Sequence, residues 1–386
     1  MIPNVSISIT YGNIGGAQTT NDNIVGVITT GTGTGTLSLL TPTFVVSLPD
    51  AESKGITEQT EPELYRILKE FYSIEGTRGA KVYCMIAANT VSLETMLDKT
   101  NANGAKKLID FAQGEIKALA VSRKPDESYV PAVPQFIDSD AIAALPKAKE
   151  LVADYFAAIK PFRVLIGARV HDAAHLTIFQ PKAQDNNKAA LVLGGTQNDG
   201  QASLGLVLGR FAATPVHRNL GRVKDGALPV DALYIGTKKV EDFATLDNLI
   251  DYGYITFTKY PQKAGYFISD DPMATAATDD YRFLANCRVI DKAAVVAYQT
   301  YVNDLKDDVD LEPNGSITPI VLKHLEGMIE NNINLSMGES ISSVNAYIDP
   351  NQNLATGSKL RVQLRITPRG YLKEIAVELG FGLASN

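Results

Sequence analysis

The segment GTGTGT, residues 31–36, has the composition of an anion-binding loop. It follows an apolar run, and clustered glycines let backbone N–H groups approach a phosphate. It lacks both the Gly-Lys-Ser/Thr ending of a phosphate loop and the third glycine of a dinucleotide-binding turn. We therefore expect a Thr/Gly turn here rather than a nucleotide site, and no cofactor.

A second segment, HDAAH, would place His171 and His175 one turn apart if it were helical, as in a zinc site. Asp172 stands where a zinc protease carries glutamate, but its side chain is one methylene shorter and no third ligand follows. Because the chain has only four histidines, we favour a loop after a strand and no metal site. A metal-dependent α/β enzyme is the alternative that these residues leave open.

The remaining candidate motifs lack a residue or a spacing that their chemistry needs. GESIS at 338–342 lacks the final glycine of the tight turn that presents a nucleophilic serine. The acidic stretch at 270–280 lacks the alternating spacing of a calcium loop. Cys287 precedes Arg288, but its apolar setting, like that of Cys84, favours an inert thiol. We therefore expect no catalytic site.

Composition narrows the function classes. The 386 residues are 45% hydrophobic and 20% charged, as in ordinary globular proteins, and are enough for two or three domains. A net charge of -7 argues against broad contact with nucleic acid, which needs a surplus of Lys and Arg. Apolar runs stay short of the ~18 residues of a membrane span, and the N-terminus lacks the basic and apolar regions of a secretory signal. We expect no membrane insertion and a cytoplasmic location.

From about residue 24, short apolar runs alternate with helical patterns, which is typical of an α/β domain with a mostly parallel, covered sheet. This domain would occupy residues 21–240. Thr60 followed by Glu63 predicts a capping box at the start of its first helix. The predicted strands are 23–29, 81–88, 116–122, 162–168 and 188–195, and the predicted helices are 61–72, 104–114 and 147–160.

After residue 240 the pattern changes to α+β, which predicts a separate C-terminal assembly domain at 241–386. Strands are predicted within 252–269, helices at 290–306 and 318–331, and further strands after them.

The end of the chain has its most regular polar pattern. Residues 360–367 and 374–381 each alternate apolar and polar side chains, and residues 368–370, Pro-Arg-Gly, supply a turn, which predicts an antiparallel hairpin. The same pairing forms within one chain or between two, so the pattern leaves that choice open. If paired residue numbers sum to 739, the opposed pairs are Arg365 and Glu374, Arg361 and Glu378, Val362 and Val377, and Leu364 and Ile375.

The N-terminus carries a shorter strand pattern. Val5, Ile7 and Ile9 alternate with serines, without charges, and a Gly/Asn/Thr-rich stretch follows. Residues 1–20 are therefore predicted to form a detachable N-terminal strand arm.

Residues 252–302 resemble the C-terminal domain of contractile tail sheath proteins, which belong to phages and related injection systems. The matching features are a glycine-containing strand pair with AGYFISDD, the run DDYRFLANCRVIDK before a long helix, and the closing strand–turn–strand. The resemblance extends more loosely over the α/β half. Members of the family carry two successive basic residues where this chain has Cys287 and Arg288.

The resemblance implies a structural protein rather than an enzyme, namely a sheath subunit that polymerises helically around an inner tube. Neighbouring subunits would exchange terminal strands, which agrees with the physics of strand addition. The implied partners are further copies of the chain, the inner tail tube protein, and baseplate and terminator proteins, in a virion tail or in the bacterial cytoplasm. The helix at 318–331 would face the tube. Another virion component, such as a baseplate protein, is the alternative.

The resemblance also assigns the assembly interface to the two ends of the chain. The receiving strand would lie at residues 362–366. Its charged residues Arg361 and Arg365 would face Glu378 and Glu374. The donated strands would make contact through Val5, Ile7, Ile9, Ile375, Val377 and Leu379.

Overall fold

The computed structural model describes residues 22–131, 136–171, 177–355, 357, 359–373 and 375–377. A six-stranded sheet forms the centre of the N-terminal half, in the order β2-β3-β1-β4-β5-β6, and only β2 runs antiparallel to its neighbour. The prediction of an α/β domain with a mostly parallel sheet is confirmed. The strands are β1 (Val25–Gly31), β2 (Thr43–Val45), β3 (Val82–Ala88), β4 (Ala118–Val121), β5 (Arg163–Gly167) and β6 (Ala189–Val192).

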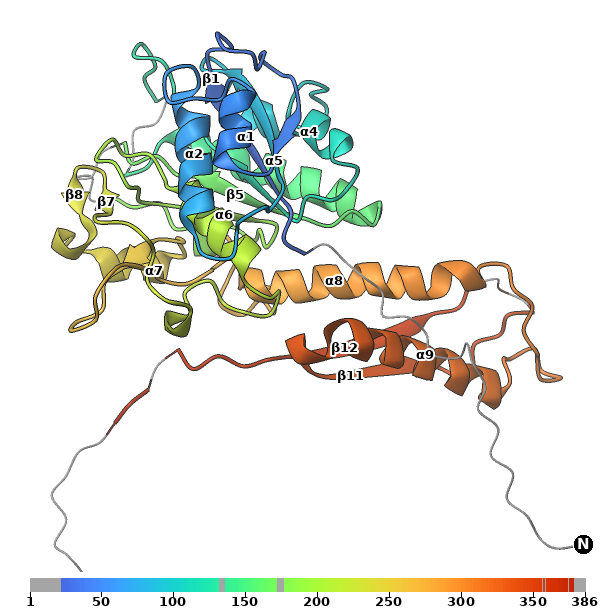
Figure 1. The fold of residues 1–386 in the computed structure, drawn as a ribbon. Coiled ribbons are helices and arrows are strands. Elements are labelled where there is room, and N and C mark those ends of the chain that lie inside the picture. Colours follow the sequence, from blue (N-terminus) through green and yellow to red (C-terminus); the bar gives the residue numbers. More distant parts are fainter. Residues whose placement is uncertain are drawn as a thin grey trace, which may run out of the picture.

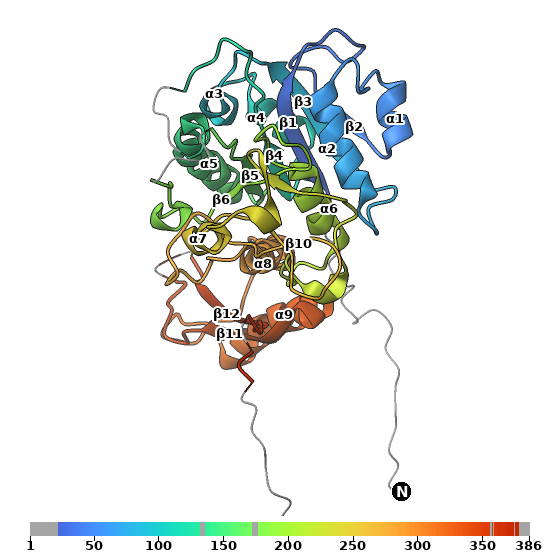
Figure 2. The same cartoon turned by 90° about the vertical axis from the view of Figure 1, so that its left-hand side faces the viewer.

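Helices cover both faces of this sheet (Figures 1 and 2), so its strands are continuous apolar runs rather than alternating ones. Helices α2 and α6 pack together on one face, and α3 and α5 pack together on the other. The helices of this half are α1 (Leu48–Ser53), α2 (Pro62–Ser73), α3 (Leu93–Leu97), α4 (Ala105–Phe111), α5 (Ser139–Ala157) and α6 (Leu204–Ala213).

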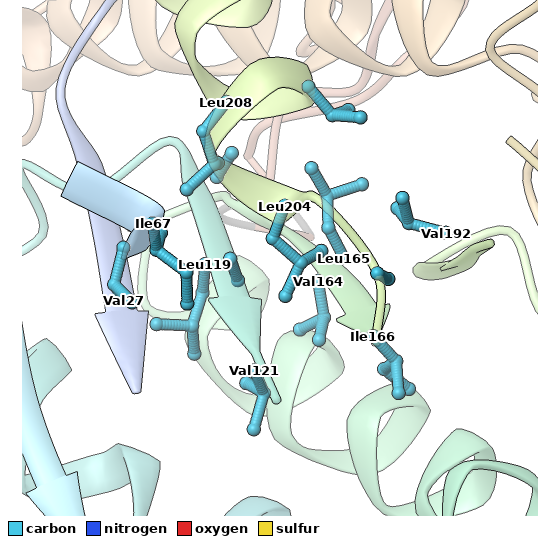
Figure 3. Close-up of a cluster of buried hydrophobic side chains, with 14 of the residues drawn as sticks. Val27, Ile67, Leu119, Val121, Val164, Leu165, Ile166, Val192, Leu204 and Leu208 are labelled. Atoms are coloured by element: carbon cyan, nitrogen blue, oxygen red, sulfur yellow. The ribbon is translucent and has the colours of Figure 1, made fainter. Parts of the chain in front are cut away.

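Two glycines set how closely α6 approaches α2. Figure 3 shows Ile67 of α2 and Leu204 of α6 among the side chains that cover the strands. A Cβ on Gly205 would lie 2.1 Å from the carbonyl oxygen of Ile67, and one on Gly209 would lie 2.9 Å from that of Phe71. Larger residues at these two positions would force the helices apart, because close-packed interiors leave no room for added atoms.

The predicted capping box of α2 and the predicted start of α5 are wrong. The N-cap of α2 is Glu61, and the Thr60 hydroxyl donates instead to the carbonyl of Gly55 at 2.6 Å, so the predicted capping box does not form. Helix α5 begins at Ser139 rather than near 147 and continues through Pro146. The carboxylate of Asp138 caps it by accepting from the backbone N–H of Asp140 at 3.0 Å.

The chain between the sheet and the C-terminal domain forms short elements. The main hydrophobic core continues through them as far as Cys287. They are β7 (Tyr234–Ile235), β8 (Lys238–Lys239), α7 (Leu246–Tyr252), β9 (Phe257–Thr258) and β10 (Phe267–Ile268), with single 3-10 turns at Pro181–Ala183, Val223–Asp225 and Val240–Asp242.

The C-terminal domain is built on a long helix, α8 (Leu284–Tyr301), which extends from the α/β half. Helix α9 (Pro319–Met337) and the strands β11 (Ile341–Ile348) and β12 (Val362–Pro368) lie beside it (Figure 1). Two 3-10 turns, Val302–Asp304 and Gly338–Ser340, follow the helices. The apolar residues that join these elements include Val289, Val296, Ile329, Ile333 and Met337.

A buried ion pair connects α8 to the central sheet. Arg163 of β5 donates from Nε to Oδ2 of Asp291 at 2.7 Å and from Nη2 to Oδ1 at 2.5 Å. The Arg163 and Asp291 side chains are only 2% and 9% exposed. Arg163 also donates to the carbonyl of Asn187 at 2.9 Å. The sheet and α8 are therefore joined by a buried, bidentate ion pair.

We expect Asp291→Asn to lower the free energy of unfolding by about 3–5 kcal/mol, because it leaves the Arg163 guanidinium buried without a counter-charge. Urea denaturation measures this. The control is Lys149→Ala, which breaks an exposed pair with Asp185 and should change stability little. Equal, small losses in both variants would show that the buried pair does not hold the junction.

Candidate assembly site

Strands β11 and β12 form a two-stranded antiparallel sheet in which Ala346 faces Leu364 and Ile348 faces Val362. The Leu364 and Val362 side chains pack toward the apolar clusters of α8 and α9, whereas Arg361 and Arg365 are exposed. The alternation predicted for residues 360–367 is therefore confirmed. The pairing with β11 was not predicted. Residues 375–377 lie outside any strand and residues 374 and 378–381 lie outside the described residues, so the predicted pairing with 374–381 stays a prediction.

Helix α9 closes the outer edge of β11. Glu330 Oε1 accepts from the backbone N–H of Ala346 at 2.7 Å, and Glu326 Oε1 accepts from that of Ile348 at 2.7 Å. The spacings match, because four residues of helix rise about 6 Å and two residues of strand extend about 6.7 Å. Two glutamates one helical turn apart thus bind the outward-pointing N–H groups of the last part of β11, at Ala346 and Ile348.

The other edge of the sheet, along β12, is open. In an antiparallel pair, opposed residues alternate between those that exchange hydrogen bonds and those that point away from each other. Because Ala346 and Ile348 direct their N–H groups to α9, their opposites Leu364 and Val362 direct N–H and C=O groups away from β11. No strand of the described residues pairs with that edge. Within the described ranges, the sheet therefore leaves one row of main-chain groups without a partner strand.

The segment after β12 contacts the part of the chain that precedes α8. Tyr371 donates its hydroxyl to the carbonyl oxygen of His217 at 2.5 Å. Lys373 forms an ion pair with Asp270, and its Nζ lies 3.4 Å from the ring centroid of Phe283. Burial raises the pKa of Tyr371 well above its usual range, so the hydroxyl stays protonated and can donate.

Beyond these contacts the segment projects into solvent. Leu372, Ile375 and Val377 are 88%, 71% and 72% exposed, respectively. A groove of about 740 Å³ lies between residues 366–373 on one side and residues 277–283 with the start of α8 on the other. An apolar segment that buries little surface in its own chain is available to a partner.

The predicted interface residues are thus divided between two places. Arg361, Val362, Leu364 and Arg365 lie together at β12, whereas Ile375 and Val377 lie on the projecting segment, outside any strand of the described chain. The other predicted residues, Val5, Ile7, Ile9, Glu374, Glu378 and Leu379, lie outside the described residues, so their pairings stay predictions.

The sequence pattern did not single out Glu326 and Glu330 as residues of this site. The available signal was their spacing of one helical turn on a helix that directly precedes a strand.

The GTGTGT loop is filled by the chain itself. The Glu61 carboxylate, which is 1% exposed, accepts from the N–H of Gly33 at 2.7 Å and from the N–H of Thr32 at 3.1 Å. The Thr32 hydroxyl donates to the same carboxylate at 3.3 Å. Two of the amides that would cradle a phosphate, those of Thr32 and Gly33, are therefore already bound to an internal carboxylate, which agrees with the interpretation of this loop as a turn.

Of the candidate metal ligands in HDAAH, the structure describes only His171. His171 is exposed, and Asp172 and His175 lie outside the described residues. Over the ranges that the structure describes, no three or more His, Cys, Asp or Glu side chains are arranged to hold a metal ion. Over the same ranges, no helix combines the length and apolar character needed to cross a membrane.

The two cysteines are buried free thiols, as expected. Burial raises the pKa of Cys287 to about 12 and also raises that of Cys84. The neighbouring Arg288 donates to the carbonyls of Phe211 and Thr214 at 3.1 and 3.0 Å at the end of α6, and burial lowers its pKa to about 10. Arg288 therefore stabilises packing and does not activate the thiol.

Two family models cover nearly the whole chain. The model described as the DUF2586 N-terminal domain matches residues 2–272, and that of the DUF2586 C-terminal domain matches residues 280–386. The chain belongs to the DUF2586 family. The division between the two DUF2586 models lies just before α8. A search of curated proteins finds no match to the chain.

Solved structures with the same fold as this DUF2586 protein come from contractile injection systems. The helical sheath of the anti-feeding prophage in its contracted state is 13% identical, with a TM-score of 0.62 over 98% of this chain and 99% of that one. A chain of the baseplate of the same prophage is 12% identical, with a TM-score of 0.59 over 99% of both. The contracted sheath complex of an extracellular contractile injection system, PVC, is 10% identical, with a TM-score of 0.54 over 98% of both. The resemblance to contractile sheath proteins is confirmed at the level of the fold.

We expect Glu330→Ala to lower the free energy of unfolding by about 1–3 kcal/mol, because the Ala346 N–H loses its acceptor at the closed edge. Glu330→Gln keeps an acceptor oxygen at the same reach and should cost less. Urea denaturation and amide hydrogen exchange at Ala346 measure the difference. Identical behaviour of the two variants would contradict a capping role for the carboxylate.

Proposed function

We propose that this protein is a structural subunit of a contractile sheath whose copies polymerise helically around an inner tube by exchanging strands. The observation that carries this proposal is the contrast between the two edges of the C-terminal sheet, in a chain with the fold of sheath proteins. One edge is closed by α9 and the other is left open along β12.

Strand addition at the open edge suits a polymer. The free main-chain groups of β12 supply affinity, and the alternating side chains of residues 361–366 supply register. The receiving edge and the projecting segment at 375–377 are different surfaces of one chain, so each copy is both donor and acceptor. Such head-to-tail contacts extend into a helix when the rotation between copies does not close a ring.

The termini would provide the donated strands. In this proposal Ile375, Val377 and Leu379 enter a neighbouring subunit, and Val5, Ile7 and Ile9 of the N-terminal arm enter another. The partners would be the inner tail tube, which the exposed face of α9 contacts, and baseplate and terminator proteins at the ends. The assembled sheath would lie in a virion tail or in the bacterial cytoplasm, and the chain would have no enzymatic activity.

A baseplate role is the second candidate. It is favoured by the similarity to a chain of the anti-feeding prophage baseplate. The two roles differ in the length of the assembly, because a baseplate component forms a closed ring or a short stack rather than a long tube.

We expect deletion of residues 375–386 to abolish polymerisation without lowering the melting temperature, because Ile375 and Val377 bury little surface within their own chain. Negative-stain electron microscopy of the full-length protein should show hollow tubes or cogwheel-shaped ends, and the truncated protein should remain monomeric. Differential scanning calorimetry provides the stability measurement.

Deletion of residues 1–12 is the matched test of the other arm and should give the same result. A large loss of thermal stability in either variant would show that the deleted segment packs within its own chain. A full-length protein that stays monomeric at high concentration would overturn the sheath proposal, and short rings alone would favour the baseplate role.

A further inference from the structure

The contacts of Tyr371 and Lys373 bear on whether the C-terminal strand pairs with its own β12 or with that of another copy. We propose that these two residues are an anchor that prevents the hairpin within one chain and so commits residues 375–379 to a neighbouring subunit. This inference rests on the strand exchange proposed above and adds the residues that decide its direction.

A hairpin within one chain would require Tyr371 and Lys373 to lie along β12, which is not where the structure places them. In the register whose paired numbers sum to 739, Tyr371 would lie opposite Pro368 and Lys373 opposite Ile366, at the open edge of β12. Instead, Tyr371 is bonded to His217 and Lys373 to Asp270, both in the part of the chain that precedes α8. The segment that would have to turn back along β12 is held on a different part of the molecule.

The anchor is attached to a rigid point. The Asp270 carboxylate that receives Lys373 also accepts from Nδ2 of Asn219 at 2.7 Å and from the N–H of Asp271 at 2.9 Å. Asp271 is fully buried and bonds the first turn of α8, where its carbonyl accepts from the N–H of Leu284 at 2.8 Å. The ring of Phe283 lies against the Lys373 ammonium in a cation–π contact. Lys373 is therefore fixed to the start of α8.

The geometry also defines how the released strand would pair in a neighbouring chain. Since Val362 and Leu364 point their main-chain groups at the open edge, Val377 and Ile375 would exchange hydrogen bonds with them. Arg365 and Glu374 would then oppose each other without a direct main-chain bond, at the closer of the two spacings. Opposite charges on the exposed face would favour this register over its neighbours.

Cysteine cross-linking distinguishes pairing within a chain from pairing between chains. The full-length protein carries Arg365→Cys and Glu374→Cys, and the natural thiols are buried and do not interfere. Mild oxidation followed by a non-reducing gel should give a ladder of covalent oligomers. With Tyr371→Phe and Lys373→Ala added, we expect the ratio of monomeric to oligomeric cross-links to rise about tenfold, since a hydrogen bond and an ion pair are lost.

Lys373→Arg is the matched control, because it keeps the charge and should keep the ladder, and circular dichroism checks that each variant is folded. A monomeric cross-link with the anchor intact would overturn the inference, as would an unchanged ladder when the anchor is removed. The unchanged ladder would leave the proposed strand exchange standing. Absence of any cross-link in both backgrounds would overturn the strand exchange at β12 itself.

Discussion

Every backbone N–H and C=O group in a sheet needs a partner, and a sheet of two strands has two edges at which those groups are unpaired. In this protein Glu326 and Glu330 bind two N–H groups of one edge, those of Ile348 and Ala346, at 2.7 Å each. The other edge, along β12, has no such cover in the described residues. A lone pair of strands is marginally stable, and in the proposed assembly a further strand would be accepted at the β12 edge only.

The remaining structure supports this edge. The Arg163–Asp291 pair joins α8 to the central sheet, so the C-terminal domain is held on a large, close-packed α/β body. Both ends of the described chain are tied near the same helix. Asp22 forms an ion pair with Lys292 of α8 at 2.6 Å, and Lys373 is bound to Asp270 just before α8 begins. A pull on either terminal strand would therefore act on α8 and, through Arg163, on the sheet.

The sequence predicted the parts that local pattern controls. The buried strands β1 and β3 to β6 are continuous apolar runs, and β12 alternates, so all were found. The pairing of β12 with β11, which precedes it, was not predicted. Pro368 and Gly370 are good turn residues, and they favour a pairing with the strand pattern that follows them. That choice depends on non-local contacts: the α9 glutamates at the β11 edge, and the anchor of Tyr371 and Lys373 on His217 and Asp270. The start of α5 was similarly not predicted, because a proline inside a helical pattern usually marks its beginning or end, whereas α5 starts at the Asp138 cap and continues through Pro146.

The most direct test of this account is a cryo-electron microscopy reconstruction of the assembled protein at a resolution that traces individual strands. The account predicts a strand of a neighbouring copy paired along residues 362–366, with Glu326 and Glu330 still bonded to Ile348 and Ala346. A β12 edge that is bare in the assembly, or is covered by residues 373–379 of its own chain, would contradict it.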